Sequence, residues 1–189
     1  MILFIFTGFS GAGKSTITKA ISQALKLSVI EERKITAELT KQAGYQRTRD
    51  WMETIGTSGV RDRAAQRTVE LIQEQVAQPG FIIDGCYDPN FLTHLETAFP
   101  ESRVFVIHIH TTEANRRQRV TDREGTPAEQ ATKEMEFIDG LKLAAGMMEL
   151  ITKAHFHIEN NGPLDHTIAL LTRKLESELA PTSSRERKF

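Results

Sequence analysis

The stretch GFSGAGKST, residues 8–16, has the residue types and spacing of a loop that binds phosphate. The template G-x-x-x-x-G-K-[ST] falls on Gly8, Gly13, Lys14 and Ser15. Glycines permit backbone angles closed to other residues, so successive N–H groups can turn inward as an anion cradle. Lys14 is expected to reach the β- and γ-phosphates, and the Ser15 hydroxyl to bind Mg²⁺. We therefore expect this loop to bind a nucleoside triphosphate with Mg²⁺.

The residues on either side of the loop support this interpretation. Residues 2–6 form a continuous apolar run, as expected of a strand buried on both faces of a parallel sheet. A helical pattern starts directly after the loop, and its N-terminus adds partial positive charge. A glycine-rich turn with a chance lysine is the alternative, but it does not explain why strand, loop and helix occur together. The predicted nucleotide-binding residues of the loop are Gly8, Ser10, Gly11, Ala12, Gly13, Lys14, Ser15 and Thr16.

The composition narrows the class of protein. A chain of 189 residues suits one α/β domain with a substantial core. Its 24 basic and 25 acidic residues nearly balance, so there is no electrostatic basis for nonspecific nucleic-acid binding. No apolar run approaches the ~20 residues that span a bilayer, and the start lacks a basic region and a cleavage site. With a single cysteine, Cys86, these features favour a cytoplasmic protein without a membrane partner.

Strand and helix patterns alternate along the chain, which predicts a doubly wound α/β sheet of five parallel strands flanked by helices in three layers. The strands are expected at residues 2–6, 28–30, 81–84, 103–110 and 155–159. Helices are expected at 14–26, 88–99, 112–123 and 126–154, and after NNGPLD to Leu179. A mainly helical stretch, 33–78, is broken at Gly44 and at GTSG, and its last helix ends before Pro79. The apolar face of helix 126–154 is expected to contain Met135, Ile138, Leu141, Ala145 and Met148.

Asp84 ends the strand FIID and precedes Gly85. In an open parallel sheet the ligand crevice lies at the carboxyl ends of the strands. A carboxylate there can reach Mg²⁺ through water or hold the acceptor group. The alternative is an ordinary turn aspartate before glycine. We expect Asp84 to act at the site, because the fold requires such a group at this position.

The stretch EANRRQRVTDRE is strongly basic, and its spacings of 3 and 4 put Arg116, Arg119 and Arg123 on one helix face. Like charges at this spacing repel, and a phosphate-rich ligand would offset the repulsion. Guanidinium groups suit this role, because they can bridge two phosphate oxygens. The alternative is a solvated face with Glu113 and Asp122 as partners. We expect the helix to contribute to the site, because it begins at the carboxyl end of a strand.

Two further groups of residues have open interpretations. The histidines at 108, 110, 155 and 157 could cluster on neighbouring strands and bind a metal, but packed neutral histidines are the better expectation because no cysteine or acidic partner stands at ligand spacing. The segment 33–63 carries several basic residues and two aromatic ones, namely Arg33, Lys34, Arg47, Arg49, Arg61 and Arg63 with Tyr45 and Trp51. These would suit an acceptor that bears a phosphate, and they would suit an exposed charged helix pair almost as well.

With these motifs in order, the chain resembles the nucleotide-kinase branch of P-loop phosphotransferases, meaning adenylate-kinase-like and dephospho-CoA-kinase-like proteins. The resemblance rests on GFSGAGKST, IIDG, the E-x-x-R-x-x-R helix at 113–119 and HFHIENNG. It implies a P-loop NTPase fold, with Arg119 near the donor base, Arg123 near the transferring phosphoryl group, and Asn160 and Asn161 near the adenine ring. It also implies an acceptor-binding flap at 33–78 and a very short lid at 124–127.

Together these expectations describe an ATP- and Mg²⁺-dependent phosphotransferase. Its domain is expected to span residues 1–179, followed by a basic tail at 180–189. The expected catalytic residues are Lys14, Asp84 and Arg123, the metal ligands Ser15 and Asp84, the further ATP-binding residues Arg119 and Asn161, and the acceptor-binding residues Arg33, Arg49, Arg61 and Arg116. The acceptor is expected to be a small phosphate-bearing molecule of the nucleoside monophosphate or dephospho-CoA type. The alternatives are a nonenzymatic nucleotide-binding switch and an RNA-associated ATPase of kinase-like fold.

Overall fold

The computed structural model describes residues 1–124 and 127–180, with residues 123 and 124 placed by their backbone only. The expected basic tail at 180–189 therefore lies outside the described residues beyond Ala180. The same holds for residues 125 and 126 of the expected lid at 124–127. Within the described ranges, no helix combines the length and the apolar character needed to cross a membrane.

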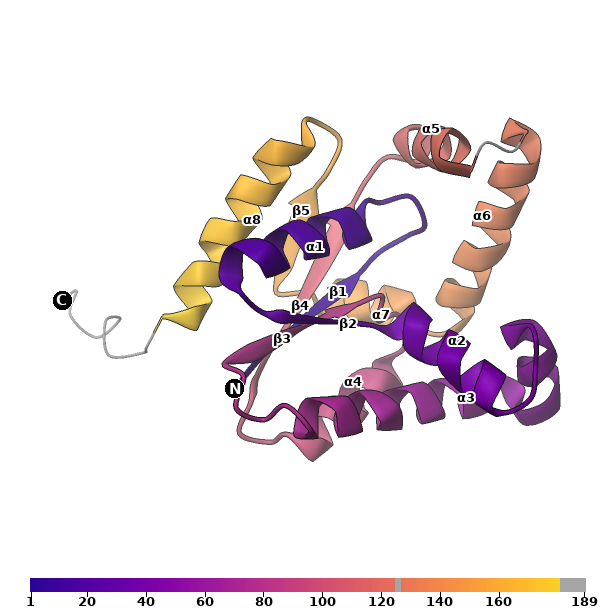
Figure 1. The fold of residues 1–189 in the computed structure, drawn as a ribbon. Coiled ribbons are helices and arrows are strands. Elements are labelled where there is room, and N and C mark those ends of the chain that lie inside the picture. Colours follow the sequence, from indigo (N-terminus) through magenta and orange to yellow (C-terminus); the bar gives the residue numbers. More distant parts are fainter. Residues whose placement is uncertain (125–126, 181–189) are drawn as a thin grey trace.

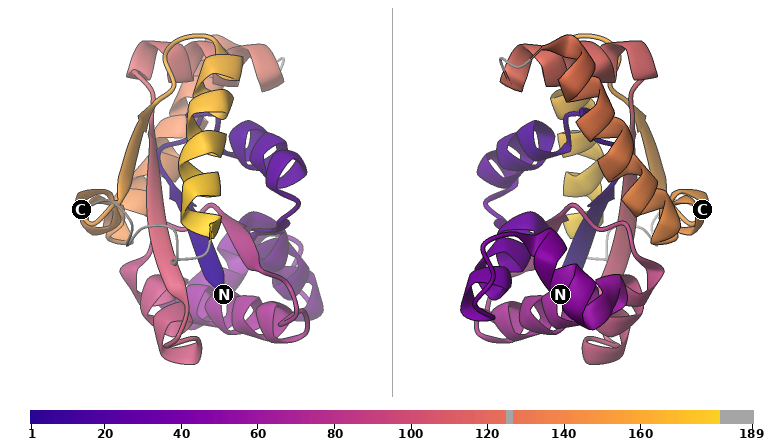
Figure 2. Two further views of the ribbon diagram at one scale, coloured as in Figure 1. Left: turned by 90° about the vertical axis from the view of Figure 1, so that its left-hand side faces the viewer. Right: turned by 90° about the vertical axis from the view of Figure 1, so that its right-hand side faces the viewer.

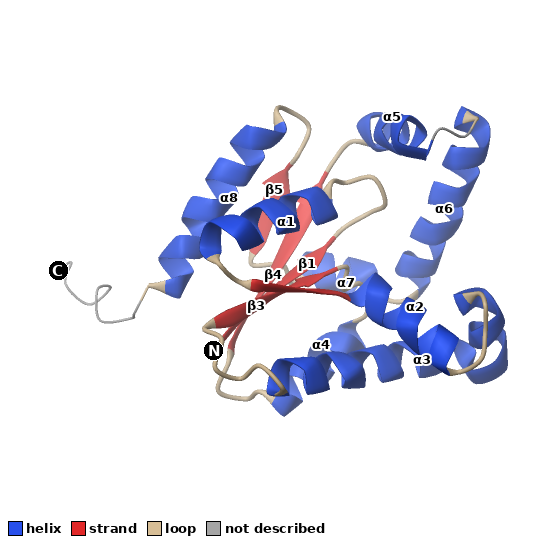
Figure 3. Cartoon of the chain, in the orientation of Figure 1, coloured by secondary structure: helices blue, strands red, loops and turns tan. Residues whose placement is uncertain are grey.

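Five parallel strands form one sheet, as predicted (Figure 3). Their order in the sheet is β2-β3-β1-β4-β5. The strands are β1 (Ile2–Thr7), β2 (Ser28–Glu31), β3 (Gly80–Asp84), β4 (Arg103–His110) and β5 (Phe156–Glu159). Each lies within one residue of its expected range at either end. Because the central strand β1 has neighbours on both sides and helices over both faces, all six of its residues are buried, which explains its continuous apolar sequence.

Eight helices lie within the described residues, and they cover both faces of the sheet (Figures 1 and 2). They are α1 (Lys14–Leu25), α2 (Glu32–Gln42), α3 (Thr48–Gln73), α4 (Pro89–Ala98), α5 (Glu113–Glu124), α6 (Ala128–Ala144), α7 (Met147–Thr152) and α8 (Leu164–Leu179). Helix α4 begins as the sequence predicts, because the Asp88 side chain accepts a hydrogen bond from the Asn90 amide and Pro89 occupies the first turn.

The core has two halves separated by the sheet. On one face, Phe4 and Phe6 of β1 pack with α1 and α8. On the other face, Leu3 and Ile5 pack with α3, α4 and α7. The carboxyl ends of all five strands therefore meet at one edge, where the loop after β1 leads into α1 (Figure 1).

The single helix expected at 126–154 is wrong, because the chain breaks at Gly146 into α6 and α7. Gly146 has a φ of +98°, and a Cβ built on it would lie 2.9 Å from Cδ of Pro89. Only glycine fits a left-handed turn this close to α4. The turn lets α7 contact β1 and β4, while α6, which precedes the turn, packs against α5 (Figure 1).

The expected apolar face of α6 is also wrong in part. Met135 is buried as predicted, but Ile138 and Leu141 are 38% and 36% exposed. The buried residues of α6 are instead Ala131, Met135, Asp139 and Lys142. The reason is that α6 stands apart from the sheet and packs on α5 and the loop after β1, where polar partners are available (Figure 1).

The end of the last helix in the stretch 33–78 is a smaller correction. The GTSG segment produces a kink within α3 at Gly56, whose φ and ψ are 79° and 156°. Helix α3 ends at Gln73, six residues before Pro79. Val76 lies beyond the helix and is exposed, because turns held by backbone bonds such as Gln78 N to Gln75 O replace the last helical turn.

Candidate active site

The loop after β1 is a backbone cradle that β4, α5 and the loop after β5 approach closely. Gly8, Gly11 and Gly13 all have positive φ. A Cβ on Gly8 would lie 2.6 Å from the Ile109 carbonyl oxygen, and one on Gly11 would lie 2.7 Å from the Arg116 carbonyl oxygen. The spacing of glycines in the sequence is thus explained twice, by backbone angle and by the close approach of β4 and α5. The arrangement is that of an anion-binding loop at a helix N-terminus.

Lys14 is turned back onto this loop. Its Nζ donates hydrogen bonds to the carbonyl oxygens of Gly8 and Phe9 at 2.8 and 3.0 Å. Burial, and next the nearby charge of Lys142, lower the pKa of Lys14 from 10.5 to about 7. Ser15 and Thr16 follow in the first turn of α1 and are exposed. An anion in the cradle would therefore find a cation held beside it and two hydroxyl groups open to it.

Asp84 ends β3 next to the loop, because it is in register with Phe6 of β1. It is 6% exposed, and its Oδ1 atom has no hydrogen-bond partner among the described residues. The charge of Asp84 acts on both Lys14 and Lys142. A buried carboxylate oxygen without a partner is costly unless a cation or a ligand satisfies it. Asp84 and the Ser15 hydroxyl are oxygen ligands of the kind that Mg²⁺ prefers, so the residues fit that ion.

A second set of polar side chains holds α6 against the loop, and we call Ser10, Arg116, Asp139 and Lys142 the clasp. Asp139 accepts a hydrogen bond from the Ser10 amide at 2.8 Å and forms an ion pair with Arg116 at 2.5 Å. Lys142 Nζ lies 2.8 Å from Ser10 Oγ and 3.3 Å from Asp139 Oδ1. Arg116 also donates to the Ser10 carbonyl at 3.0 Å, and its guanidinium lies 4.8 Å from the Phe9 ring centroid.

The side chains that α5 and α6 contribute to the clasp are buried, and their charges depend on one another. Burial would raise the pKa of Asp139, but the Ser10 amide, Lys142 and Arg116 hold it below its usual value. Burial lowers the pKa of Lys142, and Asp139 partly offsets this effect. The sequence predicted a site role for Arg116, but Asp139 and Lys142 were missed. The only signal for them was their position, since they continue the helix face of Met135 at spacings of 4 and 3.

Arg119 lies on the same side of α5 as Arg116, as the spacing predicted. It donates to the Asn160 carbonyl oxygen at 2.7 Å, and the Asn160 side chain donates to the Ala12 carbonyl oxygen at 2.8 Å. A Cβ on Gly13 would lie 2.5 Å from Asn160 Nδ2 and 3.6 Å from an Arg119 nitrogen. Arg119 is therefore placed beside the loop. The side chain of Arg123 lies outside the described part of the structure.

Asn161 and Arg117 lie farther out. The side-chain oxygen of Asn161 accepts from the Thr112 amide at 2.8 Å, which joins the loop after β5 to the start of α5. Arg117 forms ion pairs with Glu113 and Glu136 at 2.6 and 2.7 Å. Arg117 thus belongs to the solvated side of the basic helix.

On the side toward α2 and α3, Arg61 is the one expected acceptor residue that points toward Asp84 and its neighbours. It lies 3.7 Å from Asp88, stacks 5.8 Å from the Tyr87 ring centroid and donates to the Leu141 carbonyl oxygen at 3.2 Å. Tyr87 donates in turn to Glu32 at 3.4 Å. Burial raises the pKa of the Glu32 carboxyl, and the charge of Asp84 acts in the same direction. Carboxyl, phenol and guanidinium groups therefore meet beside Asp84.

The other two expected acceptor residues lie at the periphery. Arg33 is exposed on α2. Arg49 is exposed on α3, where it pairs with Glu53 at 3.3 Å and lies 5.7 Å from the Phe137 ring centroid. That contact links α3 to α6. Of the four predicted arginines, only Arg61 and Arg116 therefore lie among the buried polar groups described above.

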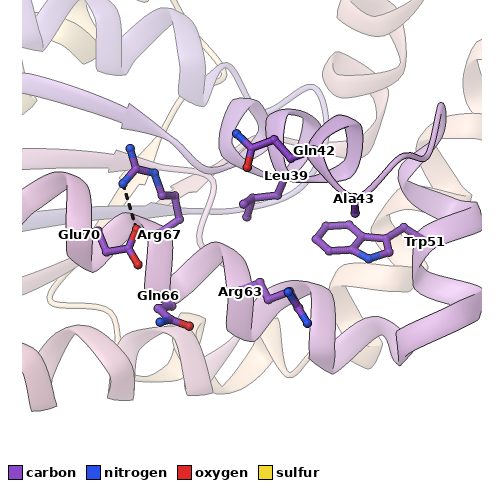
Figure 4. Close-up of a pocket in the computed structure, with 8 residues that line it drawn as sticks. All are labelled: Leu39, Gln42, Ala43, Trp51, Arg63, Gln66, Arg67 and Glu70. Atoms are coloured by element: carbon purple, nitrogen blue, oxygen red, sulfur yellow. Dashed lines mark hydrogen bonds and ion pairs between the residues drawn. The ribbon is translucent and has the colours of Figure 1, made fainter.

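A groove of about 300 Å³ lies between α2 and α3 (Figure 4). It is lined by Leu39, Gln42, Ala43, Trp51, Arg63, Gln66, Arg67 and Glu70. Of the aromatic and basic residues noted in the segment 33–63, it contains Trp51 and Arg63. None of its lining residues belongs to the loop, the clasp or the neighbourhood of Asp84, and Arg67 is paired with Glu70 at 2.9 Å.

The histidines of β4 and β5 meet only in part. His108 Nδ1 lies 3.4 Å from His157 Nδ1, and the His110 ring lies 6.0 Å from that of His108. His155 instead accepts a hydrogen bond from the Val106 amide. Burial, followed by the charges of His157 and His110, lowers the pKa of His108 to about 4, so it is neutral at physiological pH. Among the residues that the structure describes, no group of three or more metal-binding side chains is found.

Comparisons with known proteins agree with this architecture. The family described as AAA domain matches residues 7–137. A UPF0200 protein of Thermococcus onnurineus is 25% identical over 186 residues, which is 95% of this chain and 99% of its own. The crystal structure of TT1252 from Thermus thermophilus has a TM-score of 0.64 and 16% identity, covering 96% of this chain and 98% of its own. The crystal structure of the shikimate kinase from Bacteroides thetaiotaomicron has a TM-score of 0.58 and 16% identity, covering 95% of this chain and 98% of its own. The expected likeness in fold to P-loop kinases is confirmed.

Proposed function

The chain belongs to the AAA domain family, and we propose that it is a phosphotransferase that moves the γ-phosphoryl group of ATP to a small acceptor. The observation that carries this proposal is the buried Asp84 carboxylate beside the glycine cradle. Its Oδ1 atom has no partner among the described residues, and its charge acts on Lys14. A cradle, a lysine and a strand-end carboxylate are the parts that phosphoryl transfer requires.

The chain's own residues would handle the nucleotide as follows. The amides of residues 8–16 would bind the phosphate oxygens. Lys14 would exchange its two bonds to the Gly8 and Phe9 carbonyls for bonds to the β- and γ-phosphates. Ser15 and Asp84 would hold Mg²⁺, which when bound neutralises charge on the transferring group. Arg119 would lie toward the donor base with Asn161, and Arg123 would approach the transferring group.

The acceptor would lie between α6 and the α2–α3 segment, against Glu32, Asp84 and Tyr87. Asp84 would orient the acceptor oxygen that attacks the γ-phosphorus as the bond to the ADP oxygen breaks. Arg61 would bind a phosphate on the acceptor, which supports a nucleoside monophosphate or dephospho-CoA type of molecule. One of the structures with a similar fold is named a shikimate kinase, so shikimate is included among the acceptors to be tested.

A second candidate function is a nucleotide-dependent switch without an acceptor. The observation that favours it is a group of exposed apolar side chains, namely Phe137, Ile138, Leu141 and Leu143 of α6 and Met148 at the start of α7. Since α6 also holds the loop through Asp139, nucleotide binding could be reported to a partner through this helix. Such a protein would bind ATP and hydrolyse it slowly, with no dependence on an acceptor.

The experiment that tests the proposed function is a panel of acceptors with Mg²⁺ and ATP. The panel contains ribo- and deoxynucleoside monophosphates, dephospho-CoA, adenylylsulfate, shikimate and no acceptor, with ADP and the phosphorylated product both measured. Release of ADP that depends on one acceptor, together with its product, is the expected result. Equal ADP release with and without acceptors would contradict the proposal and favour the switch or an RNA-associated ATPase.

A further inference from the structure

The buried polar face of α6 is not explained by the P-loop motif itself. Asp139 stands 129 residues from Ser10 in the chain, yet it accepts the Ser10 amide hydrogen at 2.8 Å. The Ser10 amide belongs to the loop whose N–H groups the motif provides for phosphate. A carboxylate oxygen of Asp139 therefore accepts a hydrogen bond from an amide of the loop that is expected to bind phosphate.

The surroundings of Asp139 are also those of a phosphate. Arg116 contacts one oxygen at 2.5 Å, and Lys142 lies 3.3 Å from the other. The three residues are at most 9% exposed. Two cations thus face one carboxylate in a buried space, while the charge of Asp139 acts in turn on Lys14 and that of Asp84 acts on Lys142. Arg116 and Lys142 together could neutralise an anion with more than one negative charge in place of Asp139.

We propose that Asp139 stands in for the γ-phosphate in the nucleotide-free protein, and that ATP displaces it so that Arg116 and Lys142 become ligands of the γ-phosphate. This inference rests on the proposed function, because it deepens the same site. A carboxylate and a phosphate cannot share these donors, since their charges repel. ADP lacks the γ-phosphate and leaves the clasp closed, whereas ATP opens it.

The proposal assigns roles to residues that the motif does not include. Lys142 is a catalytic residue here, because it contacts the transferring group once Asp139 leaves. Asp139 is a positioning residue that acts through Lys142 and Arg116. A purely structural brace would have a different effect, because losing it would loosen the loop and weaken ATP and ADP binding alike.

The test compares the affinities of a non-hydrolysable ATP analogue and of ADP, both with Mg²⁺, by titration calorimetry. Asp139→Asn removes the competing charge, so the analogue is expected to bind about tenfold more tightly while ADP changes less than about twofold. Lys142→Met removes a γ-phosphate ligand, so the analogue is expected to bind about tenfold more weakly with ADP again unchanged. Glu134→Gln, an exposed carboxylate on the same helix, is the matched control and changes neither.

The outcomes distinguish a failure of the stand-in role of Asp139 from a failure of the proposed function. Equal changes for both ligands in either variant, or weaker analogue binding by Asp139→Asn, would overturn the stand-in role even though the wild-type protein binds nucleotide. Absence of nucleotide binding by the folded wild-type protein would overturn the proposed function as well. Thermal unfolding of each variant without nucleotide identifies any loss that comes from misfolding, and the second variant then decides the question.

Discussion

Helices α1 and α6 both hold the phosphate loop, but they do so with opposite chemistry. Helix α1 continues directly from the loop and buries Ile17 and Ile21 in the core under α8. Helix α6 approaches from a distant part of the sequence, buries Asp139 and Lys142, and exposes Ile138. Helix α1 is fixed by apolar packing, whereas α6 is held at the loop by charges and contacts α5 through a small apolar cluster of Val120, Ala131 and Met135.

The difference teaches which part of the site can move. Apolar burial of the kind seen in α1 has no alternative partner, so breaking it costs stability. The charged groups of α6 can exchange one another for a ligand of suitable charge. We therefore regard α1 as the fixed support of the loop and α6 as the part that responds to nucleotide.

The largest expected effect comes from Lys14, which lies where the two supports meet. Lys14→Ala should lower phosphoryl transfer by roughly 10³-fold, because it removes a charge aimed at the transferring group. The stability of the nucleotide-free protein should not fall. The pKa of Lys14 is about 7 in the folded protein and 10.5 in the unfolded chain, so folding disfavours the protonated amine. Lys14 therefore lowers the stability of the folded protein below pH 10.5, and this cost is fully present below pH 7. Transfer assays and thermal unfolding check both parts, with the exposed Lys19→Ala as control. Retained transfer would contradict the role of the loop.

The comparison itself is sharpened by a matched pair of isoleucines. Ile21→Ala in α1 should lower the free energy of unfolding by about 3 kcal/mol, because it leaves a cavity in the core. Ile138→Ala in α6 should change it by less than about 0.5 kcal/mol, because the side chain is partly exposed. Urea unfolding of both variants measures the difference. Similar losses in the two would mean that α6 is fixed by apolar packing too.

A smaller effect is expected at the strand-end carboxylate. Asp84→Asn should raise the Mg²⁺ concentration needed for half-maximal transfer by about tenfold, because a neutral amide is a weaker ligand for a hard cation. Titration of activity with Mg²⁺ measures this shift. The exposed Asp62→Asn on α3 is the control. An unchanged Mg²⁺ dependence would favour the reading of Asp84 as a turn residue.

The smallest expected effect is the uptake of a proton by Lys14 when nucleotide binds. Free Lys14, with its pKa lowered to about 7, is mostly neutral at pH 8, and bound phosphates would raise that pKa again. Nucleotide binding at pH 8 should therefore take up close to one proton, and affinity should fall as pH rises above 7. Calorimetry in buffers of different ionisation enthalpy counts the protons. The Lys14→Arg variant should show no uptake, because arginine stays charged. Proton release by the wild type would contradict this account of Lys14.

The sequence predicts the fixed half of this site better than the responsive half. The loop, β1 and α1 are contiguous, so the glycine spacing and the apolar periodicities of residues 2–25 are read locally. The strands β1 and β3 are buried along their whole length, so their continuous apolar runs predict them well. The edge strands β2 and β5 are only partly buried, and their short patterns are weaker signals.

The clasp escapes such reasoning for a physical reason. The periodicity rule assumes that the apolar face of a helix meets the core, and α6 does not pack on the sheet. Its Asp139 and Lys142 are buried because they find polar partners more than 100 residues away. The same applies to Glu32, whose partner Tyr87 stands 55 residues later. Pairing over such distances leaves no local pattern.

The most direct test of the account is amide hydrogen exchange with Mg²⁺ and either ADP or a non-hydrolysable ATP analogue. We predict that the analogue, and not ADP, increases exchange within residues 128–144 of α6, while residues 17–25 of α1 stay equally protected with both. This result would show that the charged support opens for the γ-phosphate and the apolar support stays in place. Equal exchange of α6 with both ligands, or its further protection by the analogue, would contradict the account.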